Sequence, residues 1–521
     1  MASLTLLTII ILPLAYLVSL VIYRIYFTRI SHIPGPKLAS VTYLYHAWYD
    51  LWPHQGRFTF HLEELHKRYG PIIRIGPDEV HIKDVNYVNE IYPSDHRRKR
   101  NKSALFFWMV GTDEFGDHSA GATLDHETHR AKRNSMAPYF SARMVRDLEP
   151  RILGKVTLLR DKFLAFSNSN QLVELRNAMS GLTLDVISEY SFGSSFGALN
   201  SNDFGRPLNN MLLQGVKVHP FARIFRPLAI FIFRLPRWLM PASEILDNSI
   251  KYDTLISSMT QSAFTDAMAS CENEKASEAA HRTIVHSMLA AESLGPEDKT
   301  FARLKADAMV LIGAGTETTA RTLATALYHI LATPRVYDKV LAEVRTIMPS
   351  ADSPIPPVTK ICQLKYLTAV LEESLRIAHG VAGRLSRIAP DEDLFYDGLK
   401  LPKGVTFSQS MYYIHSDPSV YPFPDEFHPE RFLEGEEAVS KKWDVALAKE
   451  HLQPFGKGTR NCLGINLAWS ELYLTVGALI GSVKMELVDT GKEDVMIVKE
   501  YFVGYLPEAS KGIRVKVLGK S

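Results

Sequence analysis

Residues 455–464 read Phe-Gly-Lys-Gly-Thr-Arg-Asn-Cys-Leu-Gly. This stretch places Cys462 in a glycine-rich loop, and apolar residues at helical spacing follow it from Leu463 onward. The free N–H groups and the dipole at the start of a helix stabilise a thiolate, and glycines let a flat group approach the backbone closely. The stretch therefore predicts one anionic sulfur at the start of a helix, with a buried structural thiol as the alternative.

A single soft, anionic sulfur suits haem iron as an axial ligand. Phe455 would then shield the sulfur, and Arg460 would pair with a haem propionate. The pattern F-x-x-G-x-R-x-C-x-G resembles the cysteine-ligand signature of the cytochrome P-450 haem-thiolate monooxygenases, and it is matched at Phe455, Gly458, Arg460, Cys462 and Gly464. The resemblance implies haem b bound through Cys462, and a mainly α fold with small β-sheets.

Residues 314–319 read Ala-Gly-Thr-Glu-Thr-Thr within a long apolar helical pattern. Gly313 and Gly315 weaken the helix locally and are expected to let it pass close to a planar group. A threonine hydroxyl can bond a freed carbonyl, and an adjacent acid can feed it protons. The motif resembles A-G-x-[DE]-T-[TS] of the same family, which implies that Thr318 lies beside dioxygen with Glu317 as its acid partner. A helix N-cap or a kink is the alternative.

Glu373 and Arg376 are three residues apart on one predicted helix face, where they can pair. Such pairs are usually surface decoration. Here they resemble the family's E-x-x-R element, and residues 427–432 resemble its P-E-R-F element. The resemblance implies a buried network of Glu373, Arg376 and Arg431 that holds the Cys462 loop.

Haem carries two propionates, so further cationic partners are expected. Residues 126–140 resemble the family's W-x-x-x-R helix, with His129 in place of the tryptophan and Arg133 four residues later. An imidazole can still donate a hydrogen bond. Arg387 matches a further propionate-binding arginine. Each of these side chains could instead be a solvated surface group.

Electrons must come from outside, because the chain carries no glycine-rich dinucleotide or flavin fingerprint. The resemblance implies an NADPH-dependent flavoprotein reductase as the partner. Arg130, Lys132 and Lys457 are predicted near the thiolate side and could form its docking patch, with plain solvated charges as the alternative.

Apolar residues at the family's substrate positions predict a lipophilic substrate, although any core would contain such residues. They are Phe106, Phe107, Trp108, Met309, Ile312, Val381, Ala382, Phe502 and Val503. Residues 379–387 resemble filamentous-fungal members of the trichodiene-oxygenase type, which implies a terpenoid or polyketide intermediate of secondary metabolism. Sterols, fatty acids and xenobiotics stay open.

Two other functions are compatible with a bound haem. One is a haem-thiolate enzyme that rearranges peroxides or closes rings without external electrons. The other is a non-catalytic haem carrier or gas sensor. The intact Glu317-Thr318 pair argues against both, because neither function needs a proton path.

The composition gives the broad class. Of the 521 residues 46% are hydrophobic, which allows a large core, and 59 basic residues nearly balance 57 acidic ones. That balance argues against nucleic-acid binding. Three cysteines far apart in the sequence indicate a reducing compartment.

The N-terminus predicts a membrane anchor. Leu4–Tyr23 is a mostly apolar run, close to the roughly 20 residues that span a bilayer, although a buried globular helix is the alternative. Arg24, Arg29 and Lys37 follow it. The positive-inside rule then predicts a single-pass protein of the endoplasmic reticulum membrane that faces the cytosol. The predicted segments are an anchor at 1–23, a basic linker with a Pro-Gly-Pro hinge at 24–40, and a haem domain at 41–521.

Local patterns predict the remaining elements. Helices are expected over 141–165, 172–192, 250–270, 297–333 and 361–379. Short strands are expected over 72–75 and 79–82, with a hairpin after 390. Residues 220–241 combine aromatic, aliphatic and arginine side chains, which suits a segment lying in a membrane interface, or else an ordinary packed helix hairpin.

Overall fold

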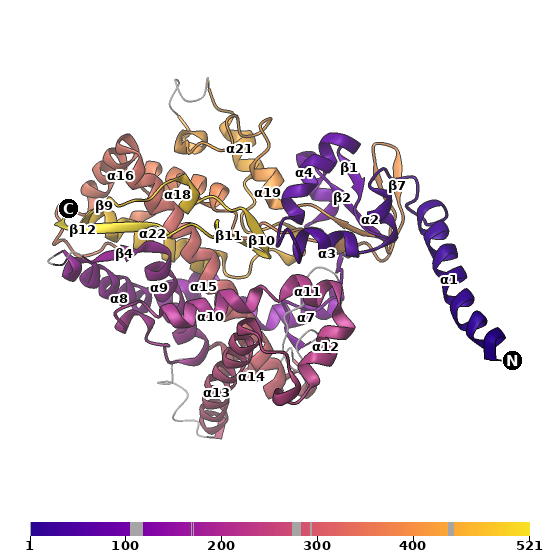
Figure 1. Cartoon of the computed structure of the whole chain (residues 1–521). Coiled ribbons are helices and arrows are strands. Elements are labelled where there is room, and N and C mark those ends of the chain that lie inside the picture. The colour runs from indigo at the N-terminus through magenta and orange to yellow at the C-terminus, as the bar shows by residue number, and fades with distance from the viewer. Residues whose placement is uncertain are drawn as a thin grey trace.

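The computed structural model describes residues 2–104, 118–167, 169, 171–272, 283–291, 294–435 and 442–521. Long helices form most of the molecule, and small sheets lie at both of its ends, one beside the N-terminal helix and one beside the C-terminus (Figure 1). The longer helices of the body are α4 (Phe58–Tyr69), α7 (His126–Met136), α8 (Ala142–Phe166), α9 (Leu175–Phe192), α10 (Arg206–Val216), α13 (Glu244–Glu272), α15 (Phe301–Ala332), α16 (Pro334–Ile347), α18 (Lys365–Ala378) and α22 (Ile465–Ser482).

Shorter helices connect these elements, and one further helix, α1 (Ala2–Tyr26), stands outside the body. The short helices are α2 (Lys37–Val41), α3 (Leu44–Asp50), α5 (Val88–Ile91), α11 (His219–Ile224), α12 (Arg226–Arg234), α14 (Ile284–Ala290), α17 (Val358–Ile361), α19 (Met411–His415) and α21 (Val445–His451).

The largest described sheet has the strand order β1-β2-β8-β5-β3. Its strands are β1 (Ile72–Arg74), β2 (Glu79–Ile82), β3 (Asn101–Lys102), β5 (Arg387–Ile388) and β8 (Thr406–Ser408). Strand β2 pairs in parallel with β8, and β3 pairs antiparallel with β5 so that Lys102 lies opposite Arg387. This register brings two basic residues that are far apart in the sequence to one edge of the sheet.

The other strands form smaller sheets. One has the order β4-β12-β9, from β4 (Leu172–Glu174), β9 (Val483–Leu487) and β12 (Arg514–Lys520). Two hairpins pair β6 (Leu394–Tyr396) with β7 (Leu399–Leu401), and β10 (Lys499–Tyr501) with β11 (Val503–Tyr505). In the first hairpin Asp397 and Gly398 have φ values of 46° and 76°, as a two-residue hairpin turn requires.

The central helix α15 packs closely on α9. A Cβ atom added to Gly315 would lie 2.9 Å from Cγ1 of Ile187, so only glycine allows the two helices to approach this far. The prediction that Gly315 accommodates a planar group is therefore wrong, because this glycine faces α9. At Gly313, in contrast, an added Cβ meets no atom within 4 Å. The open side of α15 thus lies at Gly313.

The predicted helices and strands are confirmed, except that residues 172–174 form strand β4, so that α9 begins only at Leu175. The helix patterns at 141–165, 172–192, 250–270, 297–333 and 361–379 correspond to α8, α9, α13, α15 and α18. The short runs at 72–75 and 79–82 are β1 and β2, and the hairpin after 390 is β6-β7. Long amphipathic patterns and glycine-containing turns were therefore sufficient to locate these elements.

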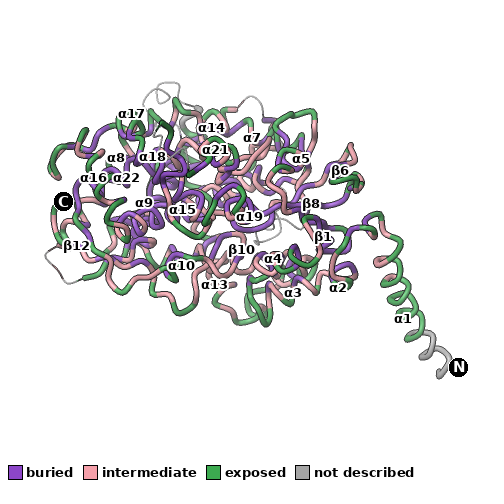
Figure 2. The backbone as a smooth tube through the Cα atoms, turned by 90° about the horizontal axis from the view of Figure 1, so that it is seen from above, coloured by how far each residue is buried: buried purple, intermediate pink, exposed green. Residues whose placement is uncertain are grey.

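Helix α1 points away from the body, and its described side chains are mostly exposed (Figure 2). Among the described residues, no helix is both long and apolar enough to cross a bilayer. The predicted location, a single-pass protein of the endoplasmic reticulum membrane, is therefore wrong.

Candidate active site

The Cys462 loop is held by its own backbone. The N–H of Cys462 donates to the carbonyl oxygen of Phe455 at 2.8 Å, and α22 begins three residues after the sulfur at Ile465. Gly458 has a φ of 77°, and a Cβ there would lie 2.6 Å from the carbonyl oxygen of Tyr92. A side chain at 458 would therefore displace the loop, which explains the glycine.

Cys462 is exposed at the side of this loop. Protein atoms nevertheless surround the thiol closely enough for desolvation to raise its pKa, while the N–H of Gly464 and the charge of Arg133 lower it. Coordination to a metal deprotonates such a thiol. Phe455 is partly buried, with its ring centroid 6.3 Å from that of Trp469. The loop thus presents one sulfur just before the start of α22.

Four cationic side chains surround a buried imidazole near this loop. Desolvation, together with the charges of Arg460, Lys102, Arg133 and Arg387, lowers the pKa of His129 to about 2. His129 is therefore neutral. Burial also lowers the pKa of Arg460 to about 9, with Arg387 lowering it and Asp125 raising it. Cations that are shielded from water need nearby anions, because an unpaired buried charge is energetically costly. The two carboxylates of a haem fit this arrangement, as the exposed Cys462 sulfur fits its iron.

Arg460 also organises the neighbouring backbone. Its guanidinium donates to the carbonyl oxygens of Thr123 at 2.7 Å, Leu124 at 2.7 Å and Asp125 at 2.9 Å. Arg387 donates to the carbonyl oxygen of Ser386 at 3.0 Å. Both arginines thus stand at the predicted site, and Arg460 in addition ties the segment before α7 to the Cys462 loop.

Sequence reasoning missed Lys102. It stands opposite Arg387 in the sheet, and its ammonium group donates to the carbonyl oxygen of Gly121. Burial lowers its pKa well below the usual value, and Arg387 and Arg460 add repulsion. The basic run from Arg97 to Lys102 was the available signal, but only the strand pairing shows which of these cations faces the site.

The motif at 314–319 has one open side and one buried side. Ala314 is exposed, and the Thr318 hydroxyl donates to the Ala314 carbonyl oxygen at 2.8 Å. A Cβ on Gly380 would lie 3.7 Å from Cβ of Thr318, so the loop after α18 passes beside this threonine. Thr318 therefore stands at the open side of α15, in reach of a bound molecule.

Glu317 lies on the other side of the same turn. It is 8% exposed, and its carboxylate pairs with the guanidinium of Arg176 at the start of α9. Although desolvation opposes the charged form, the Glu317 carboxylate raises the pKa of Arg176. Sequence reasoning missed Arg176, because no local pattern connects two residues 141 positions apart. Glu317 is thus held as an ion pair on the α9 side.

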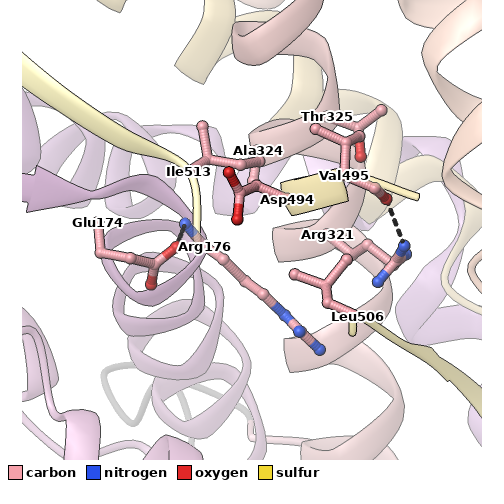
Figure 3. Close-up of a pocket in the computed structure, with 9 residues that line it drawn as sticks. All are labelled: Glu174, Arg176, Arg321, Ala324, Thr325, Asp494, Val495, Leu506 and Ile513. Atoms are coloured by element: carbon pink, nitrogen blue, oxygen red, sulfur yellow. Dashed lines mark hydrogen bonds between the residues drawn. The ribbon is translucent and has the colours of Figure 1, made fainter. Parts of the chain in front are cut away.

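A small pocket lies beside Arg176, between the start of α9, α15 and the C-terminal segments (Figure 3). The backbone N–H of Arg176 donates to Oε1 of Glu174 at 3.0 Å, and its side chain extends away from this cap along the pocket. Arg321 donates to the carbonyl oxygen of Val495 at 3.1 Å on the same wall. The pocket is therefore lined by the same arginine that pairs with Glu317.

The structure brings Glu373, Arg376 and Arg431 together in a fully buried cluster. Arg376 donates from Nε and Nη2 to the two Glu373 oxygens, each at 2.8 Å, and Arg431 donates from Nε at 3.2 Å. Arg376 also donates to the carbonyl oxygen of His415 at 2.8 Å, and His415 Nε2 accepts the N–H of Gln453 at 3.0 Å. A continuous set of contacts thus joins this cluster to the chain entering the Cys462 loop.

The candidate substrate contacts have different outcomes. Phe106, Phe107 and Trp108 lie outside the described residues. Met309 and Ile312 are 2% and 0% exposed within the large core, so the ordinary-core alternative holds for them. Ala382 and Val503 are also buried, whereas Val381 and Phe502 are partly exposed. The helical register turns Met309 and Ile312 away from the open side of α15.

The predicted docking patch is partly wrong. Lys132 is 6% exposed, and its ammonium group donates to the carbonyl oxygen of His118 at 3.0 Å. It faces the protein interior, because its position on α7 lies on the buried side. Arg130 is exposed, with Glu127 at 3.5 Å, and Lys457 is partly exposed.

Asp307 fastens the segment before α7 to α15. Its Oδ1 accepts the N–H of Ala120 at 2.7 Å, and Arg303 Nε lies 3.3 Å from its Oδ2. Burial raises the pKa of Asp307 to about 6, although Arg303, the Ala120 N–H and Lys132 lower it.

We expect this carboxyl to make stability depend on pH. The folded pKa lies above the unfolded value of about 3.9, so the stabilisation is complete below that pH and is lost as the pH rises to about 6. The difference in unfolding free energy between wild type and Asp307→Asn should therefore fall by up to about 3 kcal/mol across this window. Urea unfolding at several pH values measures it, and a difference independent of pH would contradict the expectation.

Comparisons with known proteins agree with this geometry. Residues 34–508 match the cytochrome P-450 family. The monooxygenase ucsK of Acremonium sp is 45% identical, with 97% of this chain and 96% of the relative covered. The monooxygenase TRI4 of Trichoderma arundinaceum is 32% identical over 96% of this chain and 94% of its own length. The monooxygenase aflU of Aspergillus parasiticus is 32% identical over 96% and 95%. The chain therefore belongs to the cytochrome P-450 family of monooxygenases, which carry haem b and take electrons from NADPH through a reductase.

Proposed function

We propose that this monooxygenase inserts one oxygen atom from O2 into a lipophilic intermediate of fungal secondary metabolism, either a terpenoid or a polyketide. The observation that carries the proposal is the exposed Cys462 sulfur beside a group of desolvated cations. The likeness of residues 379–387 to trichodiene-oxygenase-type members supports the substrate class, and the fungal origin of the relatives supports the setting.

In this proposal the chain holds the haem in two ways, through its iron and through its propionates. Cys462 would bind the iron, and Arg387, Arg460 and Lys102 would face the propionates, with the neutral His129 as a hydrogen-bond donor. When bound, haem supplies an iron that activates dioxygen, and a thiolate ligand favours O–O cleavage. Gly464 follows the sulfur by two residues, and a Cβ added there would meet no atom within 4 Å.

Two protons are needed for each oxygen inserted, and Thr318 and Glu317 would move them. The Thr318 hydroxyl donates to Ala314, which leaves its oxygen lone pairs able to accept a further hydrogen bond. Glu317 is held by Arg176 on the far side of the helix turn. A proton passing between the two side chains therefore requires Glu317 to rotate or a water molecule to bridge them.

Thr318→Ala tests this path. Without the hydroxyl, we expect product formation to fall on the order of 10²-fold while NADPH oxidation continues, since general acid–base groups contribute at least this much. Product and NADPH are measured together in the presence of reductase. Thr318→Ser keeps a hydroxyl and should recover most of the lost product. An unchanged ratio of product to NADPH in Thr318→Ala would exclude the assigned role.

The substrate would lie at the open side of α15, near Ala314 and Thr318. Val381 and Phe502 are the partly exposed apolar candidates from the loops around it. Apolar walls with few polar groups favour a lipophilic molecule. The reductase would dock on the side of the Cys462 loop, where Arg130 and Lys457 remain as candidate contacts.

We further propose that residues 41–521 form one haem domain and that residues 220–241 contact lipid headgroups without crossing a membrane. Large apolar side chains are exposed in the second segment, namely Leu228, Phe231, Trp238 and Leu239. Arginines accompany them at 226, 234 and 237, a combination that suits an interfacial position.

The proposal is tested by NADPH consumption with reductase present and absent. A monooxygenase consumes NADPH only with reductase, and consumption rises when substrate is added. A haem-thiolate isomerase would form product without NADPH, and a carrier or sensor would form none. Candidate terpenoids and polyketides supplied one at a time then identify the substrate by their oxidised products.

A further inference from the structure

Arg321 is a buried arginine on α15 that donates to main-chain carbonyl oxygens of three other segments. It is 4% exposed, and it follows Thr318 by three residues, so it lies about one turn further along the helix. Its Nε donates to the carbonyl oxygen of Ala378 at 2.7 Å, Nη1 to that of Gly504 at 3.2 Å, and Nη2 to that of Val495 at 3.1 Å, the bond drawn in Figure 3. One planar guanidinium thus joins segments that are far apart in the sequence.

The first of these oxygens lies at the end of a helix. Ala378 is the last residue of α18, so its carbonyl oxygen has no partner within that helix, and the helix dipole places partial negative charge there. A cation is favourable at this position. Burial, together with the charge of Arg176 and against that of Glu317, lowers the pKa of Arg321 to about 9, so the guanidinium stays charged at neutral pH. Arg321 therefore caps α18 from another helix.

The chain beyond this cap runs beside Thr318. His379 has a φ of 46° and turns the chain out of α18. A Cβ on Gly380 would lie 3.7 Å from Cβ of Thr318, and the next residue, Val381, is one of the partly exposed apolar candidates. The capped end of α18 therefore sets how far this loop stands from the threonine.

The other two oxygens lie on the two sides of the β10-β11 hairpin. Val495 precedes β10 by four residues, and Gly504 lies in β11, two residues after Phe502 at the hairpin tip. Glu500 of β10 accepts the N–H of Phe502. Its carboxylate also packs on the loop after α18, since a Cβ on Gly383 would lie 2.7 Å from its Oε1. The hairpin and the loop thus contact each other, and one guanidinium holds both on α15.

We propose that Arg321 is a positioning residue for the substrate site: it ties the end of α18 and the β10-β11 hairpin to α15, and so sets the distance between Thr318 and the two segments that carry Val381 and Phe502. This inference rests on the proposed function, which places the substrate at the open side of α15. It gives a role to a buried cation whose acceptors are all neutral carbonyl oxygens.

The test compares Arg321→Gln and Arg321→Lys with wild type in the full-length haem protein. Glutamine is too short to reach three carbonyl oxygens, and lysine keeps the positive charge but carries it on one nitrogen. Arg345→Gln is the matched control. Arg345 also ties distant segments through main-chain oxygens, but it lies on α16, near the C-terminus in Figure 1. Its acceptors are Met348, Gly481 and Ser521.

Two readouts report on the tied segments. Hydrogen exchange of the folded protein measures how easily the backbone opens at residues 379–386 and 501–505, and it requires no turnover. Spectral titration with imidazole and with 4-phenylimidazole, which both bind haem iron, gives the dissociation constants of a small and a larger molecule. The added phenyl ring must fit the apolar walls, whereas imidazole extends little beyond the iron. Circular dichroism and the thermal midpoint establish that each variant is folded.

We expect Arg321→Gln to exchange at least about tenfold faster at both segments, because a hydrogen bond to a charged group contributes about this much. The dissociation constant of 4-phenylimidazole should rise about tenfold, since loosened walls must be ordered on binding, while that of imidazole stays within about twofold. Arg321→Lys should show most of both effects, because charge alone does not hold three oxygens. Arg345→Gln should leave both segments and both dissociation constants unchanged.

Three results would overturn the inference. If Arg321→Lys equals wild type, Arg321 acts through its charge on Glu317 and not as a tie. If only one of the two segments exchanges faster, the guanidinium does not hold both. If exchange rises throughout the chain and both dissociation constants rise together, the role of Arg321 is general stability.

The milder variant keeps the inference testable. If Arg321→Gln yields no folded haem protein, Arg321→Lys decides by the same two readouts. Failure of the proposed function is distinguishable, because the wild-type protein would then lack the spectrum of a thiolate-bound haem, whereas hydrogen exchange would still report the ties.

Discussion

Replacing Cys462 with alanine will lower turnover by at least about 10³-fold, equivalent to about 4 kcal/mol of activation free energy. The sulfur is exposed at the start of α22, and its loop is fixed by the bond from its own N–H to Phe455. Cys462 is the only cysteine between residues 455 and 464, all of which the structure describes. Without a thiolate the iron loses the ligand that favours O–O cleavage. Product formation with NADPH and reductase measures the effect.

Cys362→Ala is the matched control for this experiment. Cys362 is also a free, exposed cysteine, but it follows the short helix α17, and its Sγ lies 3.6 Å from the carbonyl oxygen of Thr359. Its loss should leave turnover and spectrum unchanged. If Cys462→Ala retained wild-type turnover, or if both variants lost activity equally, Cys462 would not be the iron ligand.

Glu373→Gln should cost about 3–5 kcal/mol of stability, because it removes the anion from a buried cluster and leaves two buried guanidinium groups without it. Glu373, Arg376 and Arg431 are 0%, 0% and 1% exposed, so solvent cannot compensate the change. The contacts through His415 to Gln453 would transmit the loss to the Cys462 loop. We therefore expect a lower thermal midpoint together with loss of bound haem.

Glu372→Gln provides the control for this second variant. Glu372 is the adjacent residue but faces Lys449 and Glu434, and burial raises its pKa to about 7. The same chemical change there removes no member of the cluster. A thermal midpoint and haem content that changed equally in both variants would show that the buried cluster has no special part in holding the loop.

Local patterns were sufficient for much of the fold and for part of the site. The positions of α15 and α18, the Cys462 loop and the cluster around Glu373 follow from helical periodicity, glycines and short motifs. These features depend on residues close in sequence, or on motifs whose members pair in a fixed way. The sequence therefore predicted them with correct boundaries to within a few residues.

The contacts that the sequence did not predict are between residues far apart in the chain. Arg176 meets Glu317, Lys102 meets Arg387, and Arg133 meets Asn461 across distant parts of the chain. No periodicity relates these partners, so only the packed structure reveals them. Lys132 was assigned to the surface because a lysine is usually exposed, whereas its stem is buried and its ammonium group bonds a carbonyl oxygen.

Side-chain direction on α15 explains a further error. Met309 and Ile312 lie in the predicted stretch but turn into the core, while Ala314 and Thr318 occupy the open side. Two residues that are three or four positions apart lie on the same face of a helix, whereas two residues that are one or two positions apart point in different directions. The sequence alone does not show which neighbouring helix covers α15, so it could not decide which residues of this helix face the substrate.

The absorption spectrum of the reduced, carbon monoxide-bound protein tests the central claim most directly, since it reports the ligand opposite the bound gas. We predict the band diagnostic of thiolate ligation in wild type and in Cys362→Ala, and its absence in Cys462→Ala. A folded wild-type protein that binds no haem, or that shows the band of a histidine-bound haem, would contradict the account.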